Sequence, residues 1–383
     1  MKTTLPFLIA SLALGLTISL SSATLFAQGT LTPPGGPAPT MRTLTQIEPR
    51  TPISSAPVTL NASGSYYLTT NLTVSGGDAI TIVTNGVTLD LNGFTITSTD
   101  PGATGFGIRL HSGSHDLAIL NGHVQGGVTN NAGIYSGPGF GHGVGFDSPP
   151  LVNVRVVGVS VSGCRYNGIA LGSDDATVVE GCTVRTVGSV GIVASTIKNS
   201  VALGCGSSGI YGRQVSDSRG ESLYSGSGLF AETAQNCYGS SVSGFGLYVT
   251  STALNCYGLS VSGLGLYADI SATGCQGKSS SGTGLFANTA QNCHGSSNSG
   301  TGLFANTAQN CYGQSSDDTG LYAVRSAIGC HGQTITGMRA LYAGNAAFCT
   351  AVASGGPAIQ ATVANGCYAV GGTNSIVWKY NMP

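Results

Sequence analysis

The strongest constraint on this chain is a repeat of 18 or 19 residues in its C-terminal half. A leucine column, from Leu229 to Leu341, keeps this period, and each leucine is followed by Phe or Tyr. Eight cysteines, separated in turn by 19, 19, 18, 18, 19, 19 and 18 residues, keep it too: Cys237, Cys256, Cys275, Cys293, Cys311, Cys330, Cys349 and Cys367. Self-similarity at a short, fixed period predicts a solenoid, in which each repeat forms one coil that packs on its neighbours.

The residues within the repeat indicate which kind of solenoid forms. Residues 299–316 read SGTGLFANTAQNCYGQSS. Helical repeats need about 33 residues or more, and leucine-rich repeats need several leucines per unit. Glycine would cost a helix about 1 kcal/mol at each occurrence. We therefore expect an all-β, single-stranded parallel β-helix of about 16 coils, each with three short strands. Alternation along a strand directs Leu285 and the cysteines inward, and Phe286 outward.

The chain divides into five segments by composition and periodicity. Residues 1–27 have the apolar run and small-residue end of a signal peptide, with cleavage after Ala23 or Ala27; an uncleaved membrane anchor is the alternative. We expect a flexible leader at 28–41, an N-terminal cap at 42–77 that includes a short helix from Met41, the β-helix at 78–372, and a C-terminal cap at 373–383 that folds Trp378 over the last coil.

Composition excludes several classes of partner. Charged residues make up 8% of the chain and the net charge is −1. Nucleic-acid binding and polybasic membrane-surface binding both need a basic face, so neither is expected. No cofactor and no membrane span in the mature chain are expected either.

Several stretches resemble bacterial secreted right-handed parallel β-helix proteins of pectin-lyase-like fold, of the kind found in verrucomicrobial and planctomycete-type genomes. They are TQIEPRTPI at 45–53, SYYLTTNLTVSGGDAITI at 65–82, VTLDLNGFTI at 87–96, the NCYGSS repeats and the ending ANGCYAVGGTNSIVWKYNMP. The resemblance covers nearly the whole mature chain. It implies a right-handed β-helix and says little about activity.

Catalytic candidates are few. Hydrolysis of a glycosidic bond needs two carboxylates, and the best pair is Asp174 and Asp175 in GSDDATV. His142, in FGHGVGF, resembles the Gly-His-Gly of polygalacturonases, which also have paired aspartates. In that family the aspartates come first, whereas here they follow the histidine, and the family's Arg-Ile-Lys segment is absent. The alternative for Asp174 and Asp175 is a solvated turn.

A lyase site would need calcium held by several carboxylates, with an Arg or Lys base. The acidic residues are scattered, and no three recur at one-coil spacing. The densest titratable cluster is Arg109 with His111 and His115. A lateral loop at 133–150 is the most favourable place for a site, because binding residues concentrate on loops.

The cysteine column allows three interpretations. The thiols can be buried as small apolar groups. They can form disulfides between neighbouring coils, since export favours oxidation. A metal array is the third, although the column lacks the C-x-x-C spacing of zinc sites. We expect Cys256, Cys275, Cys293 and Cys311 to be inward, reduced and aligned, and no metal to be bound.

The best binding candidates are aromatic residues that recur once per coil and point outward. They are Phe230, Tyr248, Tyr267, Phe286, Phe304, Tyr322 and Tyr342. A second, less regular line consists of Tyr238, Tyr257, His294, Tyr312, His331 and Tyr368. Such a ribbon can stack on sugar rings or on another protein, or its rings can stack on one another and stabilise the rod.

Together these features predict an exported structural or adhesive rod without catalytic activity, secreted or held at the cell surface. The expected partner is a polysaccharide or a cell-surface glycan. The alternative is a carbohydrate-active enzyme, a polysaccharide lyase or glycoside hydrolase.

Overall fold

The structure, a computed structural model, describes residues 47–146, 151–173 and 176–382. The chain divides into a unit of residues Met1–Pro49 and a compact unit of residues Arg50–Pro383. The expected signal peptide, the leader, residues 41–46 of the helix expected over 41–53, and both Asp174 and Asp175 lie outside the described residues. The end of that expected helix, Thr51–Ile53, forms strand β1 instead.

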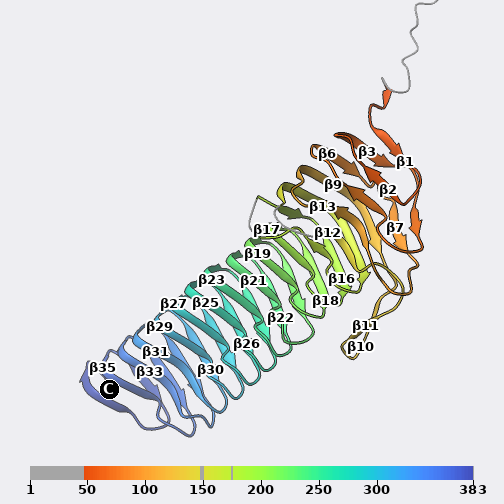
Figure 1. Cartoon of the computed structure of the whole chain (residues 1–383). Coiled ribbons are helices and arrows are strands. Elements are labelled where there is room, and N and C mark those ends of the chain that lie inside the picture. The colour runs from red at the N-terminus through yellow and green to blue at the C-terminus, as the bar shows by residue number, and fades with distance from the viewer. Residues whose placement is uncertain (1–46, 147–150, 174–175, 383) are drawn as a thin grey trace, which may run out of the picture. The chain divides into compact units, whose positions relative to one another are not determined.

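The unit from Arg50 onward is a right-handed parallel β-solenoid of about 17 turns. Of the strands described, 35 join in one parallel arrangement, and Figure 1 shows them as stacked coils along a rod. The all-β parallel β-helix predicted from the repeat is confirmed.

The N-terminal coils have three strands each. β2 pairs with β5 and β5 with β8, β3 with β6, and β4 with β7. The strands up to residue 187 are β1 (Thr51–Ile53), β2 (Val58–Leu60), β3 (Gly64–Leu68), β4 (Leu72–Val74), β5 (Ile80–Ile82), β6 (Val87–Asp90), β7 (Thr95–Ser98), β8 (Phe106–Leu110), β9 (His115–Gln125), β10 (Thr129–Asn131), β11 (Ile134–Ser136), β12 (His142–Phe146), β13 (Val152–Cys164), β14 (Ile169–Ala170), β15 (Val178–Glu180) and β16 (Thr183–Val187).

From β17 onward each coil has one long and one short strand. The long strands are β17 (Ile192–Lys198), β19 (Ile210–Ser216), β21 (Leu229–Gln235), β23 (Leu247–Leu254), β25 (Leu266–Thr273), β27 (Leu285–Gln291), β29 (Leu303–Gln309), β31 (Thr319–Ile328), β33 (Arg339–Ala347) and β35 (Ile359–Asn365). The short strands are β18 (Val201–Cys205), β20 (Arg219–Ser222), β22 (Tyr238–Ser241), β24 (Tyr257–Ser260), β26 (Gln276–Ser279), β28 (His294–Ser297), β30 (Tyr312–Ser315), β32 (His331–Thr334), β34 (Thr350–Ala353) and β36 (Tyr368–Val370); β37 (Ser375–Tyr380) is the last strand.

The expectation of three strands per coil is therefore wrong for the regular repeats. Two of the three segments run on as one long strand. Register shifts, for example between Ala231 and Thr233 and between Ala268 and Ser271, mark where neighbouring long strands depart from strict pairing. Such bulges bend a strand without ending it, so the coil turns its corner without a separate loop.

The core is a set of columns one residue wide. Leu285, Ala287 and Ala290 are fully buried in β27, whereas Phe286 between them is half-buried. In the next coil Leu303, Ala305 and Ala308 stand in register with them. The predicted inward leucine and outward aromatic residue are confirmed.

Both ends of the rod differ from the expected boundaries. Parallel pairing begins at Thr51, because β1 pairs with β3 and β2 with β5, so coil strands precede residue 78. Alternation in this stretch already buries Leu60, Leu68, Leu72 and Val74. At the other end, β37 extends the sheet by pairing with β35, and Trp378 is 59% exposed. The last segment therefore adds a strand to the last coil, on which Trp378 lies exposed.

A hairpin leaves the rod at 129–136 and overlaps only the first residues of the lateral loop expected at 133–150, of which His142–Phe146 is instead the coil strand β12. β10 and β11 pair antiparallel, and Figure 1 shows them to the side of the coils. The Tyr135 hydroxyl donates a hydrogen bond to the carbonyl oxygen of Gly204 at 3.0 Å. Burial raises the pKa of Tyr135 to about 12, so this hydroxyl keeps its proton.

Candidate ligand-binding face

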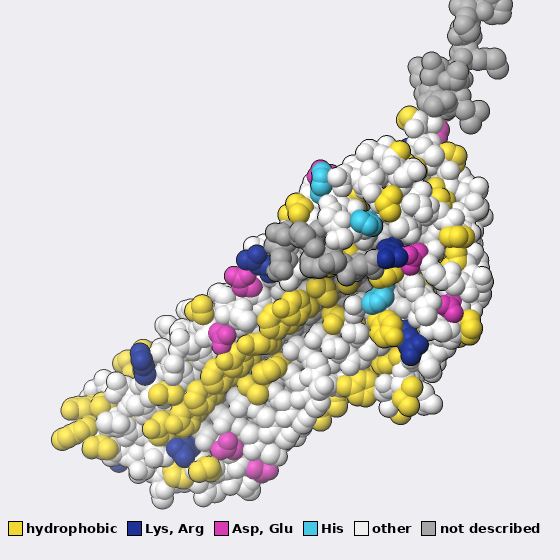
Figure 2. All heavy atoms as spheres, in the orientation of Figure 1, with side chains coloured by type: hydrophobic (Ala, Val, Ile, Leu, Met, Phe, Trp, Pro, Cys, Tyr) yellow, Lys and Arg dark blue, Asp and Glu magenta, His cyan; other side chains and the backbone are white. Residues whose placement is uncertain are grey.

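The outward aromatic residues form one continuous ladder on the long strands. Consecutive ring centroids are 4.4 to 5.0 Å apart over eight coils. The ladder contains all seven aromatic residues named from the sequence, and it starts one coil earlier, at Tyr211, which lies 4.6 Å from Phe230. Figure 2 shows a band of hydrophobic side chains that runs lengthwise over this part of the rod.

Most rings of the ladder face one another. The interplanar angles are 8° between Tyr267 and Phe286, 5° between Phe286 and Phe304, and 7° between Phe304 and Tyr322. A ring whose two faces are covered by its neighbours cannot also stack on a sugar, so this part of the ladder stabilises the rod. Tyr248 interrupts the stack: its ring is inclined at 75° to Phe230 and stacks on Phe245 instead.

A polar column runs parallel to the ladder on the same long strands. Its members are in register from coil to coil, none is buried, and each carries a hydroxyl or an amide: Thr196, Gln214, Thr233, Thr252, Ser271, Thr289, Thr307, Ser326 and Asn345. Sequence reasoning missed this column, because Thr, Ser and Gln alternate irregularly within it. The signal was present in the repeated Asn-Thr-Ala-Gln of residues 288–291 and 306–309.

The face is hollowed where the polar column passes β17 to β25. One depression of ≈ 330 Å³ is lined by Thr196, Lys198, Gln214, Thr233 and Thr252 among others. A second, of ≈ 280 Å³, lies between Ser195 and Thr233 and includes Arg213 and Glu232. The third, of ≈ 470 Å³, reaches the aromatic ladder and is lined by Ser173, Tyr211, Gly212, Arg213, Phe230, Glu232, Thr250, Ser251 and Ile270.

An ion pair lies between the second and third depressions. Arg213 Nε donates to Glu232 Oε2 at 3.2 Å, and both side chains are about half exposed. An exposed pair of this kind adds little to stability. Each group keeps further hydrogen-bonding capacity, so together they offer donors and acceptors to a polar ligand.

The catalytic candidates do not meet in one site among the described residues. His142 lies within an aromatic stack, 4.7 Å from the Phe106 ring and 5.3 Å from the Tyr166 ring. Asp174 and Asp175 are outside the described residues. They follow Ser173 directly in the sequence, and Ser173 lines the largest of the three depressions.

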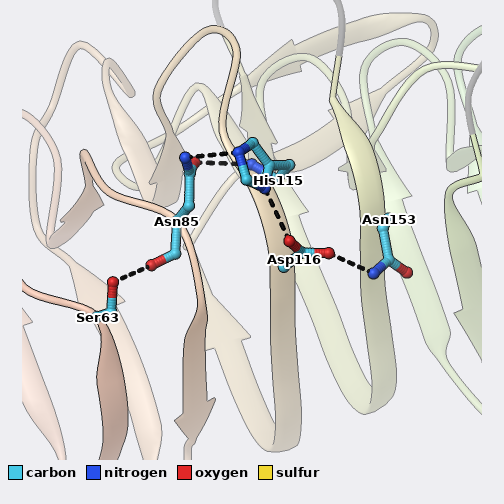
Figure 3. A network of polar contacts seen from close by, with 5 residues as sticks. All are labelled: Ser63, Asn85, His115, Asp116 and Asn153. Atoms are coloured by element: carbon cyan, nitrogen blue, oxygen red, sulfur yellow. Dashed lines mark hydrogen bonds and ion pairs between the residues drawn. The ribbon is translucent and has the colours of Figure 1, made fainter.

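The titratable cluster noted in the sequence separates into different contacts. Arg109 pairs with Asp78 at 2.9 Å, and His111 Nδ1 lies 3.1 Å from the carbonyl oxygen of Ser112. His115 instead joins a network that crosses neighbouring coils (Figure 3).

In that network both ring nitrogens of His115 have partners. Asn85 Nδ2 can only donate, so Nε2 accepts its hydrogen bond at 2.7 Å, and Nδ1 then donates to Asp116 at 2.8 Å. Hydrogen bonds from Asn153 and His115 lower the pKa of Asp116. Because Nε2 is occupied by Asn85, the pair is not arranged as a general base.

The second aromatic line is less continuous than the first. Tyr238 stacks on Tyr257 at 5.3 Å, and Tyr312 lies between His294 and His331 at 4.8 and 5.1 Å. Gln276 stands in register between Tyr257 and His294 and interrupts the line.

All eleven cysteines are buried and free of disulfides in the structure. Cys256, Cys275, Cys293 and Cys311 face inward as predicted, each 3% exposed or less. Among the described residues, no three His, Cys, Asp or Glu side chains gather closely enough to hold a metal ion. Within the same residues, no helix is long and apolar enough to cross a membrane.

Comparison with known proteins finds no matching family model and no matching curated protein. Among solved structures, the chain is similar to the A-module of mannuronan C-5 epimerase AlgE4 of Azotobacter vinelandii, with 14% identity over 84% of this chain and 88% of the other and a TM-score of 0.27. It is also similar to the AlgE6 A-module of the same organism, with 11% identity over 84% of this chain and 90% of the other and a TM-score of 0.30. At these values the likeness carries no weight for the activity of this chain.

Proposed function

We propose that this chain is an exported, non-catalytic adhesive rod that binds a polysaccharide on the hollowed face of strands β17 to β25. The observation that carries the proposal is the grouping of three neighbouring depressions, each lined by hydroxyl side chains, two of them by the Arg213–Glu232 pair and two by Gln214.

The chemistry of this face suits sugar hydroxyls. Thr233 and Thr252 can donate and accept, Gln214 does both through its amide, and the Arg213–Glu232 pair adds a charged donor beside a charged acceptor. Tyr211 begins the aromatic ladder and is 38% exposed, so its ring lines the largest depression beside these groups. Sites for small ligands commonly combine an apolar wall with a few convergent polar groups in this way.

Catalysis is the second candidate, favoured by one observation. Glu232 places a carboxylate in the largest depression, and Ser173 on its wall precedes Asp174 and Asp175 in the sequence. Two carboxylates in one cleft are what glycoside hydrolysis requires.

The test is a panel of soluble polysaccharides assayed in parallel for binding and for turnover. Titration calorimetry measures binding, and reducing ends or unsaturated products measure cleavage. We expect binding without product, and Glu232→Gln should weaken binding several-fold. The matched control is Glu221→Gln on β20, at another side of the coil, which should bind as the unaltered chain does. Turnover that Glu232→Gln or Asp175→Ala abolishes would establish the enzyme instead.

Export is also part of the proposal. It is supported by the apolar run and the small residues of positions 1–27. N-terminal sequencing of protein recovered outside the cell should begin at Thr24 or Gln28. Recovery only in the cytoplasm with Met1 intact would contradict it.

A further inference from the structure

We infer that the polysaccharide held by this face is uncharged and lies along the rod axis, with about one sugar unit per coil. The inference rests on the proposed function and adds to it the class and the orientation of the ligand. Charge, spacing and direction each contribute a separate argument.

Charge excludes polyanions and polycations. A polymer with an anionic group on every unit would need a cation in each coil, and the seven long strands from β17 to β29 contain only two, Lys198 on β17 and Arg213 on β19. A polycation would need a carboxylate in each coil, and the same strands contain only Glu232 and Asp269. Arg213 is already paired with Glu232. The polar column itself contains no charged residue, so it suits a ligand that carries only hydroxyl and ether groups.

Spacing fits one sugar unit to one coil. Strands of a sheet are about 4.8 Å apart, and the ring centroids of the ladder repeat at 4.4 to 5.0 Å. An extended chain of pyranose rings advances by a similar distance per unit. A polymer lying along the axis therefore meets an equivalent hydroxyl or amide at each successive unit.

The orientation of the polymer follows from the direction in which identical side chains repeat on this face. Along the axis, Thr289 is followed by Thr307 in the next coil, and Gln291 by Gln309. Across the strand the outward side chains change from Phe286 to Asn288 and Thr289 within a few residues. A homopolymer presents the same groups at every unit, so it should lie along the rod axis, the direction in which the side chains repeat.

The first experiment compares ligands on the full chain. Neutral glucans and xylans, polyuronates and chitosan are titrated by calorimetry at low and high salt, and then as oligomers of increasing length. We expect the neutral polymers to bind most tightly, with little salt dependence, and affinity to increase with each added unit until the oligomer spans the polar column. A polyuronate or chitosan that binds at least tenfold more tightly would overturn the neutral assignment.

The second experiment changes the length of the face. Deletion of residues 285–302 joins Gly284 to Leu303, and duplication of the same 18 residues adds a coil; both keep the register of Leu266, Leu285 and Leu303. We expect the oligomer length at which affinity levels off to decrease or increase by one unit. A lengthwise ligand confined to β17–β25 would leave it unchanged, and one lying across the strands would show no length series at all. Either result would contradict the inference that the ligand lies lengthwise along the whole polar column.

These outcomes separate the inference from the proposed function. If no polysaccharide binds, both fail. If a charged polysaccharide binds, or if length dependence does not follow the coil number, the binding function stands and the inference fails. Circular dichroism checks that each variant folds, and the duplicated chain provides the result if the shortened one does not fold.

Discussion

At the scale of single residues, each cysteine thiol links two levels of the rod. The Cys275 thiol donates to the carbonyl oxygen of Thr273 at 3.3 Å and accepts from the backbone N–H of Cys256 at 3.4 Å. The same arrangement recurs at Cys311, with Gln309 and Cys293. The thiol therefore does more than fill space: it gives a partner to the buried N–H of Cys256, whereas the carbonyl oxygen of Thr273 also accepts from the N–H of Asn255 at 2.9 Å.

Two serines occupy the same column. Ser200 donates to Lys198 O at 2.7 Å and accepts from Cys182 N at 3.2 Å, and Ser218 repeats this pattern one coil further on. A serine in this column therefore does not bury an unsatisfied hydroxyl. The hydroxyl finds the same two partners as the thiol.

This predicts which of two substitutions at Cys275 lowers the free energy of unfolding more. Cys275→Ser should cost well under the roughly 1–3 kcal/mol expected of Cys275→Ala, because alanine leaves the buried N–H of Cys256 without this partner. Urea unfolding of the two variants and the unaltered chain measures the difference. Equal losses for Ser and Ala would show that packing alone, and not the hydrogen bonds, fixes the column.

The redox state of the column is a second residue-level prediction. Within the column, the hydrogen bond with Cys256 raises the pKa of Cys275 to about 12, and burial raises the pKa of Cys164 and Cys205, which lie outside the column, to about 12. These thiols therefore stay protonated and react slowly at neutral pH. We expect thiol reagents to leave the native chain unmodified and to find eleven thiols after denaturation, without a reductant. Thiols that appear only after reduction would show that neighbouring coils are joined by disulfides.

A pH dependence follows from His294. Burial lowers its pKa, and its neighbours in the column, Gln276 and Tyr312, are uncharged near neutral pH. The folded pKa lies below the unfolded value of about 6.5, so the stability associated with the neutral ring is complete above that value and is lost as the pH falls below it. The melting temperature should therefore fall between pH 7.5 and 5, and less so in His294→Gln, which copies Gln276. Identical pH profiles for the two chains would contradict this.

At the scale of strands, glycine sets how closely the walls of the coil approach. A Cβ atom on Gly295 would lie 2.2 Å from the carbonyl oxygen of Gly302, and the equivalent Gly313 meets Gly320 at 2.3 Å. No side chain fits there without movement of the backbone. The high glycine content thus reflects a narrow cross-section as well as the turns.

The corresponding prediction compares two glycines. Gly295→Ala should destabilise the rod by about 1–3 kcal/mol or more, as overpacking of a tight core does. Gly76→Ala is the control, because its nearest atom would be an Asp100 side-chain atom at 3.8 Å. Thermal unfolding of both variants measures the effect, and similar melting temperatures would show that the coil relaxes freely at Gly295.

The same scale shows what the sequence could and could not predict. Strict repetition identified the leucine and cysteine columns, and strand alternation gave their direction. Tyr211 was not predicted to belong to the aromatic ladder, because Ile210 precedes it where later coils have leucine. The buried Ser279, which donates to Gly263 O at 2.6 Å and accepts from Gly282 N, looked like part of a polar turn. The hollows around Arg213 depend on how side chains of adjacent coils differ in size, which periodicity does not report.

At the scale of the whole molecule, a solenoid is held together by contacts between neighbouring coils, so coils should be removable in multiples of the repeat. Deletion of residues 247–302 joins Gly246 to Leu303 and leaves Leu229 facing Leu303, because these leucines share one register. Three coils are lost, and at about 4.8 Å per coil the rod should shorten by about 14 Å. Small-angle scattering of the deleted and unaltered chains measures this difference, and the far-ultraviolet spectrum should remain that of a β protein. A deletion of residues 247–293, nine residues shorter and so half a coil out of register, joins Gly246 to His294; it is the control and should not fold. If both deletions behaved alike, stability would reside in something other than the stacked columns.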